Sequence, residues 1–339
     1  LEDVRSTLVT WRFENDKFVE HSTGGGIAVG EDVSVQGLNR FSDQDDRVWL
    51  WRDGYLRVDA LDIGDASTLD ETTQVKTKPG FFDSDGLTVD QHFATSKDGT
   101  KIPYFVQRRT DMKFDGSTPT LVDAYGGFEI SMTPHYSAGV GIGWLERGGC
   151  KVIANVRGGG EYGPSWHQAA LKEKRYKAYE DVEAVAADVI KRGISSTEKL
   201  AVIGGSNGGL MVGNMITRPV ASSLFGAAVC QVPLLDMKRY SHLLAGASWM
   251  AEYGDPDTDE WKFLRQHSPY QLLRHDRLGI AEDGVSMEAD DKWTCPKVLF
   301  TTSTRDDRVH PGHARKMVKA LLEDAPSEKV PLCLYWENT

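Results

Sequence analysis

The residues best suited to chemistry are a serine and the four glycines around it. The stretch Lys199–Met215 places Ser206 and Asn207 between two glycine pairs, after an apolar run at 200–203 and before a helical pattern. Gly-x-Ser-x-Gly between a strand and a helix is typical of a nucleophilic serine. Only glycine fits beside so sharp a turn, and the helix start leaves N–H groups free for an anion. Ser206 as a simple helix N-cap is the alternative.

A nucleophilic serine of this type needs an acid later in the chain. Asp306 and Asp307 follow the apolar run at 297–302, in the sequence TTSTRDDRVHPGH. They therefore fall in a loop after a late strand, where the acid of an α/β-hydrolase is expected. An ordinary solvated turn is the alternative interpretation of the pair.

The base is harder to place, because it should follow the last predicted strand at 330–336. No histidine follows that strand before Thr339, so we expect the base beyond Thr339. His310 and His313 lie at the start of the helix after the acid loop, which is not the expected place. A metal pair formed by these two is a weaker alternative, since no third ligand lies nearby in sequence.

A second glycine-rich segment is a candidate for a dinucleotide site. Residues 158–163 read GGGEYG after an apolar run, which matches the Gly-x-Gly-x-x-Gly pattern of dinucleotide sites, with Glu180 at a suitable distance. Two features weaken this hypothesis. Pro164 and Trp166 obstruct a helix that opens on the last glycine, and Glu180 falls within a helical pattern and not at a strand end. No phosphate-binding loop with Gly-Lys-Ser/Thr is present.

From residue 120 onward, strands alternate with helices. This order predicts an α/β fold with a doubly wound parallel sheet, and ligands of such sheets bind at the carboxyl ends of the strands. The predicted strands are 120–124, 150–156, 200–203, 225–232, 297–302 and 330–336, with helices at 179–191, after Ser206, and from Pro311 to about Glu323. An earlier hairpin is expected from strands at 92–96 and 102–107.

Residues 1 to about 75 have an all-β pattern. Short alternating runs are separated by turns with Gly, Asn and Asp, which predicts one or two small antiparallel sheets. The runs are 7–13, 26–29, 33–35, 48–52 and 55–58. Such a segment buries little surface by itself, so we expect it to belong to a larger β domain.

Composition excludes several functions. The 339 residues carry a net charge of −11 with a pI near 5.3, which argues against nucleic-acid and anionic-membrane partners. No apolar run is long enough to span a bilayer. The four cysteines, Cys150, Cys230, Cys295 and Cys333, are scattered and are expected as buried thiols. We expect a cytoplasmic monomer, although a chain that begins at Leu1 leaves open a preceding signal peptide.

Four motifs in order resemble the prolyl oligopeptidase family. They are YGGF at 125–128, RGGGEYG at 157–163, GGSNGGL at 204–210 and DDRV at 306–309. The resemblance covers about residue 76 to the end, and implies an α/β-hydrolase domain at 76–339 that lacks its last segment. Residues 1–75 are similar to the last part of that family's β-propeller, which needs about four to eight blades. The chain therefore resembles a piece of a longer protein.

The resemblance also implies catalytic roles. Ser206 corresponds to the nucleophile and Asp306 to the acid that orients the base. The N–H of Asn207 and the hydroxyl of Tyr125 correspond to the two donors to the oxyanion, each typically worth about 10²–10³ in rate. The histidine of the family has no counterpart in this sequence.

Six further residues correspond to the substrate pocket of the family. Trp249 and Tyr253 match the aromatic wall against the substrate proline, and Arg308 matches an arginine that binds a substrate carbonyl. The remaining apolar positions are Phe128, Val232 and Val309. A core role for the apolar residues, and an ion pair with an aspartate for Arg308, are the alternatives.

The sequence thus predicts a serine peptidase that cleaves short peptides after proline, without metal or cofactor. Glu252 beside the pocket keeps open cleavage after Lys or Arg, as in the related oligopeptidase B. An esterase on the same fold, a dinucleotide-binding enzyme and an inactive binding scaffold are three further hypotheses. Because the histidine is not in the sequence, we expect low activity from the chain as given.

Overall fold

A computed structural model describes residues 3–339 except 25, 40, 43, 70 and 281–288. The chain forms two compact units. Unit 1 comprises Leu1–His92, Phe105–Met112 and Thr133–Cys150, and unit 2 comprises Phe93–Tyr104, Lys113–Met132 and Lys151–Thr339. The predicted domain boundary near residue 75 stays a prediction.

Unit 1 begins with antiparallel strands, each of which pairs with a neighbour in the chain. The strands are β1 (Leu8–Glu14), β2 (Lys17–Gly24), β3 (Glu31–Gly37), β4 (Arg47–Gly54), β5 (Ala60–Asp65) and β6 (Thr73–Thr77). β1 and β2 form one antiparallel pair, and β3 to β6 form an antiparallel sheet in chain order. The expected small antiparallel sheets are therefore present.

Two predicted strands of this part are wrong. Residues 26–29 contain no strand, since the backbone turns at Gly26 and Gly30 with φ of +55° and +82°. Residues 55–58 also lie outside any strand. The ring of Tyr55 is buried and lies 5.6 Å from that of Phe105, so its β-type character serves packing and not strand pairing.

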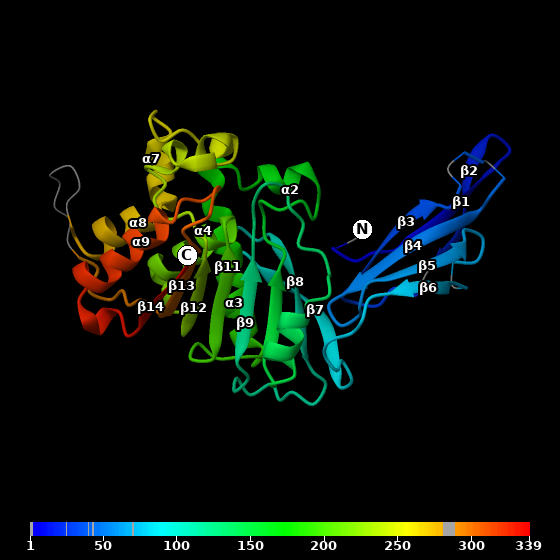
Figure 1. The fold of residues 1–339 in the computed structure, drawn as a ribbon, viewed down its shortest axis with the longest axis horizontal. Coiled ribbons are helices and arrows are strands. Elements are labelled where there is room, and N and C mark those ends of the chain that lie inside the picture. Colours follow the sequence, from blue (N-terminus) through cyan, green and yellow to red (C-terminus); the bar gives the residue numbers. More distant parts are fainter. Residues whose placement is uncertain (1–2, 25, 40, 43, 70, 281–288) are drawn as a thin grey trace. The chain divides into compact units, whose positions relative to one another are not determined.

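The rest of the chain builds an eight-stranded sheet. Its strands are β7 (Leu87–Thr95), β8 (Lys101–Arg109), β9 (Thr120–Ala124), β10 (Cys150–Ala154), β11 (Leu200–Gly205), β12 (Ala227–Gln231), β13 (Lys297–Ser303) and β14 (Cys333–Asn338). The spatial order is β14-β13-β12-β11-β9-β10-β8-β7 (Figure 1). From β9 through β11, β12 and β13 to β14, neighbouring strands run parallel, as the alternation of strands and helices predicts.

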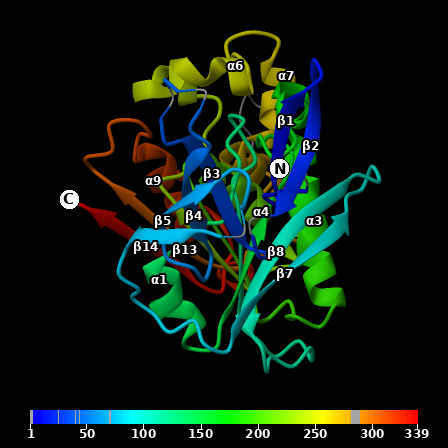
Figure 2. The same cartoon turned by 90° about the vertical axis from the view of Figure 1, so that its right-hand side faces the viewer.

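The longer helices belong to unit 2. They are α3 (Tyr176–Lys191), α4 (Asn207–Thr217) and α9 (Gly312–Lys319). Helix α4 packs on β11 and β12, α3 packs on α4, and α3 runs alongside the strands (Figure 2). Short helices are α1 (Ala138–Val140), α2 (Pro164–Gln168), α5 (Pro219–Ser222), α6 (Met250–Tyr253), α7 (Trp261–Leu264) and α8 (Pro269–Gln271). In the described part of the chain, no helix has the length and apolar character needed to cross a membrane.

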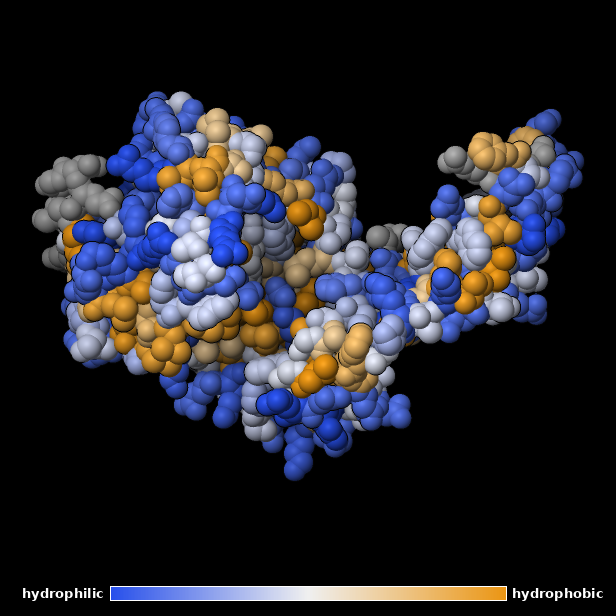
Figure 3. Space-filling view, in the orientation of Figure 1, coloured by the Kyte–Doolittle hydropathy of each residue, from blue (hydrophilic) through white to orange (hydrophobic). Residues whose placement is uncertain are grey.

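Three exposed apolar residues of unit 2 lie side by side on the edge strand of the sheet. β14 is the edge strand, and its Leu334, Tyr335 and Trp336 are exposed. Apolar surface is visible over this region in Figure 3. Of the cysteines, Cys150, Cys230 and Cys295 are buried free thiols, as expected. Cys333 on β14 is only half-buried, and burial raises the pKa of its thiol to about 11.

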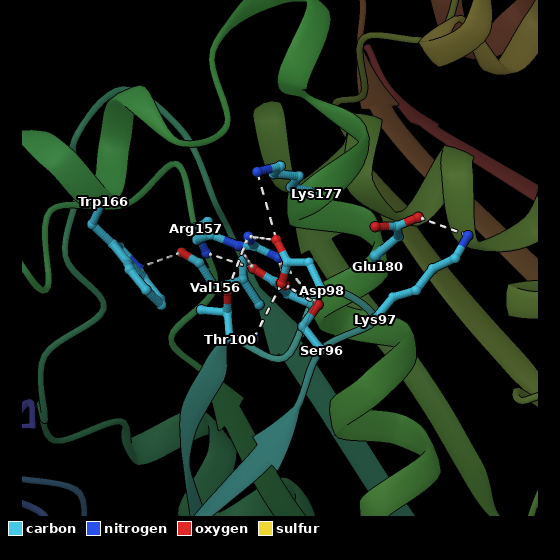
Figure 4. A network of polar contacts seen from close by, with 10 residues as sticks. Ser96, Lys97, Asp98, Thr100, Val156, Arg157, Trp166, Lys177 and Glu180 are labelled. Atoms are coloured by element: carbon cyan, nitrogen blue, oxygen red, sulfur yellow. Dashed lines mark hydrogen bonds and ion pairs between the residues drawn. The ribbon is translucent and has the colours of Figure 1, made fainter.

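A buried arginine ties the glycine loop after β10 to the neighbouring hairpin and helix (Figure 4). Arg157 donates to both carboxylate oxygens of Asp181, at 2.6 and 2.9 Å, and to Asp98 at 2.5 Å. It also reaches Ser96 at 3.1 Å and Thr100 at 3.3 Å. Both Arg157 and Asp181 are buried, and the guanidinium holds the pKa of Asp98 well below its usual value. Three segments are thus fixed by one cation.

Replacing this arginine should destabilise the protein strongly. Arg157→Met leaves the buried carboxylate of Asp181 without its cation, and loss of one partner of a buried pair costs about 3–5 kcal/mol. We expect a decrease of that size in the free energy of unfolding, measured by urea titration. Arg109→Met is the matched control, because Arg109 pairs with Asp111 at an exposed site and such pairs contribute less than about 1 kcal/mol. Equal losses in the two variants would contradict the role of Arg157.

Candidate active site

The register of the parallel strands brings four loops together at the carboxyl ends of the strands. Gly205 on β11 pairs with Gln231 on β12, which pairs with Thr301 on β13, and Ile203 pairs with Asp123 on β9. The chain therefore leaves all four strands at nearly the same level. Tyr125 follows β9, Ser206 follows β11, Val232 follows β12 and the acid loop follows β13.

Ser206 lies on a left-handed turn between β11 and α4. Its φ is 57° and ψ is −115°, a backbone conformation that is costly for any residue with a Cβ. Its N–H donates to the carbonyl of Gln231 at 3.0 Å. A Cβ at Gly204 would lie 2.5 Å from the carbonyl oxygen of Gly208, so glycine is required there. The serine itself is only half-buried, and every residue of α4 is buried.

The start of α4 provides a free backbone N–H as a hydrogen-bond donor, and Tyr125 lies beside Ser206. Asn207 is the first residue of α4, so its N–H has no acceptor within the helix. The side chain of Asn207 donates to the carbonyl of Tyr125 at 2.5 Å. Burial raises the pKa of the Tyr125 hydroxyl, while the nearby hydroxyl of Ser206 and the charge of Arg308 act in the opposite direction. The structure thus brings these three residues together.

The loop that carries Asp306 is held by hydrogen bonds from its own backbone N–H groups to the Asp306 carboxylate. One oxygen of Asp306 accepts the N–H of Arg308 at 3.0 Å and that of Val309 at 2.8 Å. This arrangement fixes the half-buried carboxylate and leaves its second oxygen available. Asp307 and Arg308 are exposed. Within the part of the chain that the structure describes, the guanidinium of Arg308 makes no ion pair, so the alternative of a simple pair with an aspartate does not hold.

Most of the predicted pocket residues share one apolar cluster. Val309 and Tyr253 are buried in it, and Phe128 and Trp249 pack against it while partly exposed. The rings of Phe128 and Tyr253 meet edge to face at 5.6 Å. Leu210, one helical turn after Ser206, belongs to the same cluster. Val232 does not belong to it, and lies at the end of β12 with a φ of 36°.

The histidines near the acid loop have structural partners. His313 is buried, and its Nδ1 accepts the N–H of Asp236 at 3.1 Å. Burial lowers the pKa of His313 to about 4. The Nδ1 of His310 accepts the N–H of Gly312 at 2.9 Å. Among the described residues, no group of three or more His, Cys, Asp or Glu side chains is arranged to hold a metal ion.

The second glycine-rich segment packs against the loop after β9. A Cβ at Gly158 would lie 2.4 Å from the carbonyl oxygen of Gly126, and one at Gly160 would lie 2.3 Å from that of Glu129. These glycines therefore allow two backbones to approach closely. Glu180 lies on α3, where it pairs with Lys97 at 3.4 Å (Figure 4). The geometry thus gives these glycines a packing role.

Sequence reasoning missed a buried polar cluster at the site. Arg175 is 2% exposed and Glu252 is 5% exposed, and their side chains pair at 2.6 Å. In the sequence, Arg175 stands within the charged run KEKRYK, which is typical of a solvated surface. One signal was present, since Arg175 precedes Tyr179 by four residues and Val182 by seven, and so extends the buried stripe of α3 by one turn.

The fold and this site define a class of protein. A parallel sheet with a nucleophile elbow after a central strand, and an acid loop after a later strand, is the α/β-hydrolase arrangement. The family model described as "Prolyl oligopeptidase family" matches residues 135–335. The chain belongs to the prolyl oligopeptidase family of serine peptidases.

Individual relatives agree with this assignment. The chain is 47% identical over 300 residues to "Uncharacterized peptidase y4nA" of Sinorhizobium fredii, covering 88% of the chain and 38% of that protein. It is 36% identical to "Prolyl endopeptidase" of Elizabethkingia miricola, covering 72% of the chain and 32% of the relative. The solved structure of a "Post-proline cleaving enzyme from Rickettsia typhi" aligns with a TM-score of 0.80 at 32% identity, covering 100% of the chain and 45% of that structure. The chain thus spans less than half the length of each relative, and the structural likeness confirms the predicted fold class.

The tightness of the serine turn gives a testable prediction. Gly204→Ala would place a methyl group against the backbone of α4, and overpacking of this kind costs about 1–3 kcal/mol. In the protein expressed from its complete reading frame, we expect a lower free energy of unfolding and at least a tenfold slower reaction of Ser206 with a fluorophosphonate. Gly143→Ala is the matched control, because a Cβ there meets no atom within 4 Å. The prediction fails if the two variants behave alike in both measurements.

Proposed function

We propose that the chain carries the catalytic centre of a peptidase that hydrolyses short peptides on the carboxyl side of proline, through an acyl-enzyme on Ser206. The observation that carries this proposal is the placement of Ser206 on a strained turn beside Tyr125 and the start of α4, next to a cluster of aromatic side chains. The chain spans part of its relatives' length, so the activity of the whole protein belongs to the proposal.

The proposed reaction is acyl transfer. The Ser206 hydroxyl attacks the carbonyl carbon of the scissile bond, and a general base oriented by Asp306 takes the proton. The carbonyl oxygen becomes an oxyanion that accepts hydrogen bonds from the N–H of Asn207 and the hydroxyl of Tyr125. The intermediate then expels the amine, which takes up the proton. Water cleaves the resulting ester by the same steps and restores the serine.

The apolar cluster supports selection of proline. Proline carries no N–H and presents a flat apolar ring, for which an aromatic face is a suitable surface. Trp249 and Phe128 are partly exposed at the edge of the cluster, where a ring could reach them. The exposed guanidinium of Arg308 would donate to a substrate carbonyl. Tyr253 is buried, and would support the pocket from behind.

The alternative of cleavage after Lys or Arg depends on Glu252. Its first oxygen accepts the N–H of Phe128 at 3.0 Å and the guanidinium of Arg175 at 2.6 Å, and its second oxygen lies 2.7 Å from Nε2 of His167. Both oxygens are thus engaged, and the charge is balanced by a buried arginine. This weighs against Glu252 as the partner of a substrate cation.

The names of relatives support the same choice. Proteins described as prolyl endopeptidases and as a post-proline cleaving enzyme are among those that the chain resembles. An esterase on the same fold is a second candidate, but an esterase would not require the proposed proline pocket. The cytoplasmic location, the monomeric state and the low activity of the isolated chain stay predictions from the sequence.

A panel of reporters tests the proposal on the protein expressed from its complete reading frame. We expect rapid release from a Gly-Pro amide, release at least 100-fold slower from the matching Gly-Lys amide, and no detectable rate for Ser206→Ala. Ser248→Ala, at an exposed serine, should keep the full rate. Hydrolysis of esters without amides, or a Gly-Lys rate above the Gly-Pro rate, would refute the proposal.

The second oxyanion donor makes a separate prediction. Tyr125→Phe removes only the hydroxyl, so kcat for the prolyl amide should fall by about 10²-fold or more with little change in KM. Tyr176→Phe serves as the control, because Tyr176 is an exposed tyrosine at the start of α3. An unchanged kcat for Tyr125→Phe would exclude that hydroxyl from the oxyanion hole.

A further inference from the structure

A cluster of buried polar side chains lies behind the proposed oxyanion donors. Arg175 donates to Glu252 at 2.6 Å and also to the side-chain oxygen of Asn207. The same oxygen of Asn207 accepts the hydroxyl of Tyr253 at 2.8 Å. The guanidinium carbon of Arg175 also lies 5.1 Å from the centre of the Tyr253 ring. We refer to these four residues as the Arg175 cluster.

The cluster touches both proposed oxyanion donors. The side-chain oxygen of Asn207 is held by Arg175 and Tyr253, which fixes the orientation of its amide. The amide nitrogen then donates to the carbonyl of Tyr125 at 2.5 Å. Asn207 supplies one proposed donor through its backbone and holds the residue that supplies the other. An error in its orientation would therefore displace both donors.

The cluster also holds the loop that follows Tyr125. Phe128 and Glu129 both have a φ of 57°, which is unusual for side chains of their size and persists only where the surroundings enforce it. Glu252 accepts the N–H of Phe128 at 3.0 Å while it binds Arg175. One guanidinium is thus connected to the Tyr125 loop by two routes, through Asn207 and through Glu252.

We propose that Arg175 is a positioning residue, which fixes the two oxyanion donors through Asn207 and balances the charge of Glu252 beside them. This inference rests on the proposed function. Arg175 is 2% exposed and its guanidinium is bonded to Asn207 and Glu252, so it acts through these two residues and not by contact with the substrate.

The opposite charges of Arg175 and Glu252 give the positioning role a measurable effect on kcat. Burial is the main cause of the raised pKa of the Tyr125 hydroxyl; the carboxylate of Glu252 adds to it, and the guanidinium of Arg175 acts in the opposite direction. Removing Arg175 alone therefore leaves an unbalanced buried carboxylate near a developing oxyanion. Removing both charges takes away that repulsion and loses only the hydrogen bonds. A purely structural role would instead make the double variant at least as poor as the single one.

The experiment compares Arg175→Met with Arg175→Met/Glu252→Gln, in the protein from its complete reading frame, on the prolyl amide reporter. We expect Arg175→Met to lower kcat about 100-fold with KM changed by less than about threefold, as for loss of oxyanion stabilisation. The double variant should recover about tenfold of that loss. Arg175→Lys should fall between wild type and Arg175→Met, because lysine keeps the charge without the forked geometry.

A second pair of variants decides the matter if Arg175→Met does not fold. Tyr253→Phe removes one hydrogen bond to Asn207, and we expect kcat to fall several-fold at constant KM. Tyr104→Phe removes a hydroxyl from another buried tyrosine, one that donates to Asp188 at 2.7 Å near the end of α3 and lies outside the apolar cluster, and should leave kcat unchanged. Equal kcat values for these two variants would overturn the inference, as would a wild-type kcat for Arg175→Met or a double variant no better than the single one.

Failure of the proposed function can be told apart from failure of this inference. If the wild-type protein cleaves no prolyl amide, the substrate assignment is wrong. The variants are then compared by their rate of Ser206 labelling with a fluorophosphonate, whose oxygen requires the same two donors whatever the substrate is. The same order of rates would support the positioning role, and equal labelling rates would refute it.

Discussion

The left-handed turn at Ser206 is the constraint on which the rest of the site depends. A residue with a Cβ in such a conformation costs about 1–3 kcal/mol, which the surrounding structure must offset. Here the N–H of Ser206 is tied to Gln231 on β12, and the following helix is buried along its whole length. The turn therefore cannot relax without separating α4 from β11 and β12. This fixes the serine above the sheet and aims the helix start at the same point.

The same strain recurs around the serine. Phe128, Glu129 and Val232 also have positive φ values. Phe128 and Glu129 lie in the loop after β9, Val232 follows β12, and both of these strands pair with β11. Buried charges hold these segments, since Glu252 binds the N–H of Phe128 and Arg157 fixes the glycine loop that packs on Gly126. The buried guanidiniums of Arg157 and Arg175 thus both stabilise loops at the carboxyl ends of the strands. Buried ion pairs contribute little net stability compared with apolar packing, so we interpret them as devices for geometry.

Much of the fold was predictable because its signals are local. The strand at 120–124 and the strand before Ser206 follow from short apolar runs that end near glycine, and such runs can be recognised without tertiary information. The N-terminal segment was harder, because Tyr55 has strand-type character but is used for packing in unit 1. Residues 26–29 failed for a different reason, since glycines on both sides allow turns that interrupt pairing.

The site was predictable only in part. Ser206 and the loop of Asp306 could be located because motif and topology place them at strand ends. Arg175 could not be singled out within its charged run, because burial of one charge among several depends on partners that are far away in sequence. Glu252 was noticed, but its meaning changed once Arg175 and the N–H of Phe128 were found on it. Sequence pattern gives residue types and spacing, and the balance of buried charge requires the fold.

We infer that Ser206, Asn207 and Tyr125 form one preorganised site for an oxyanion. The most direct measurement is a crystal structure of the protein after reaction with a peptide aldehyde that ends in prolinal. We expect a hemiacetal on Ser206 whose oxygen lies within about 3.2 Å of both the Asn207 nitrogen and the Tyr125 hydroxyl. An adduct on another residue, or a hemiacetal oxygen directed away from Tyr125, would contradict it.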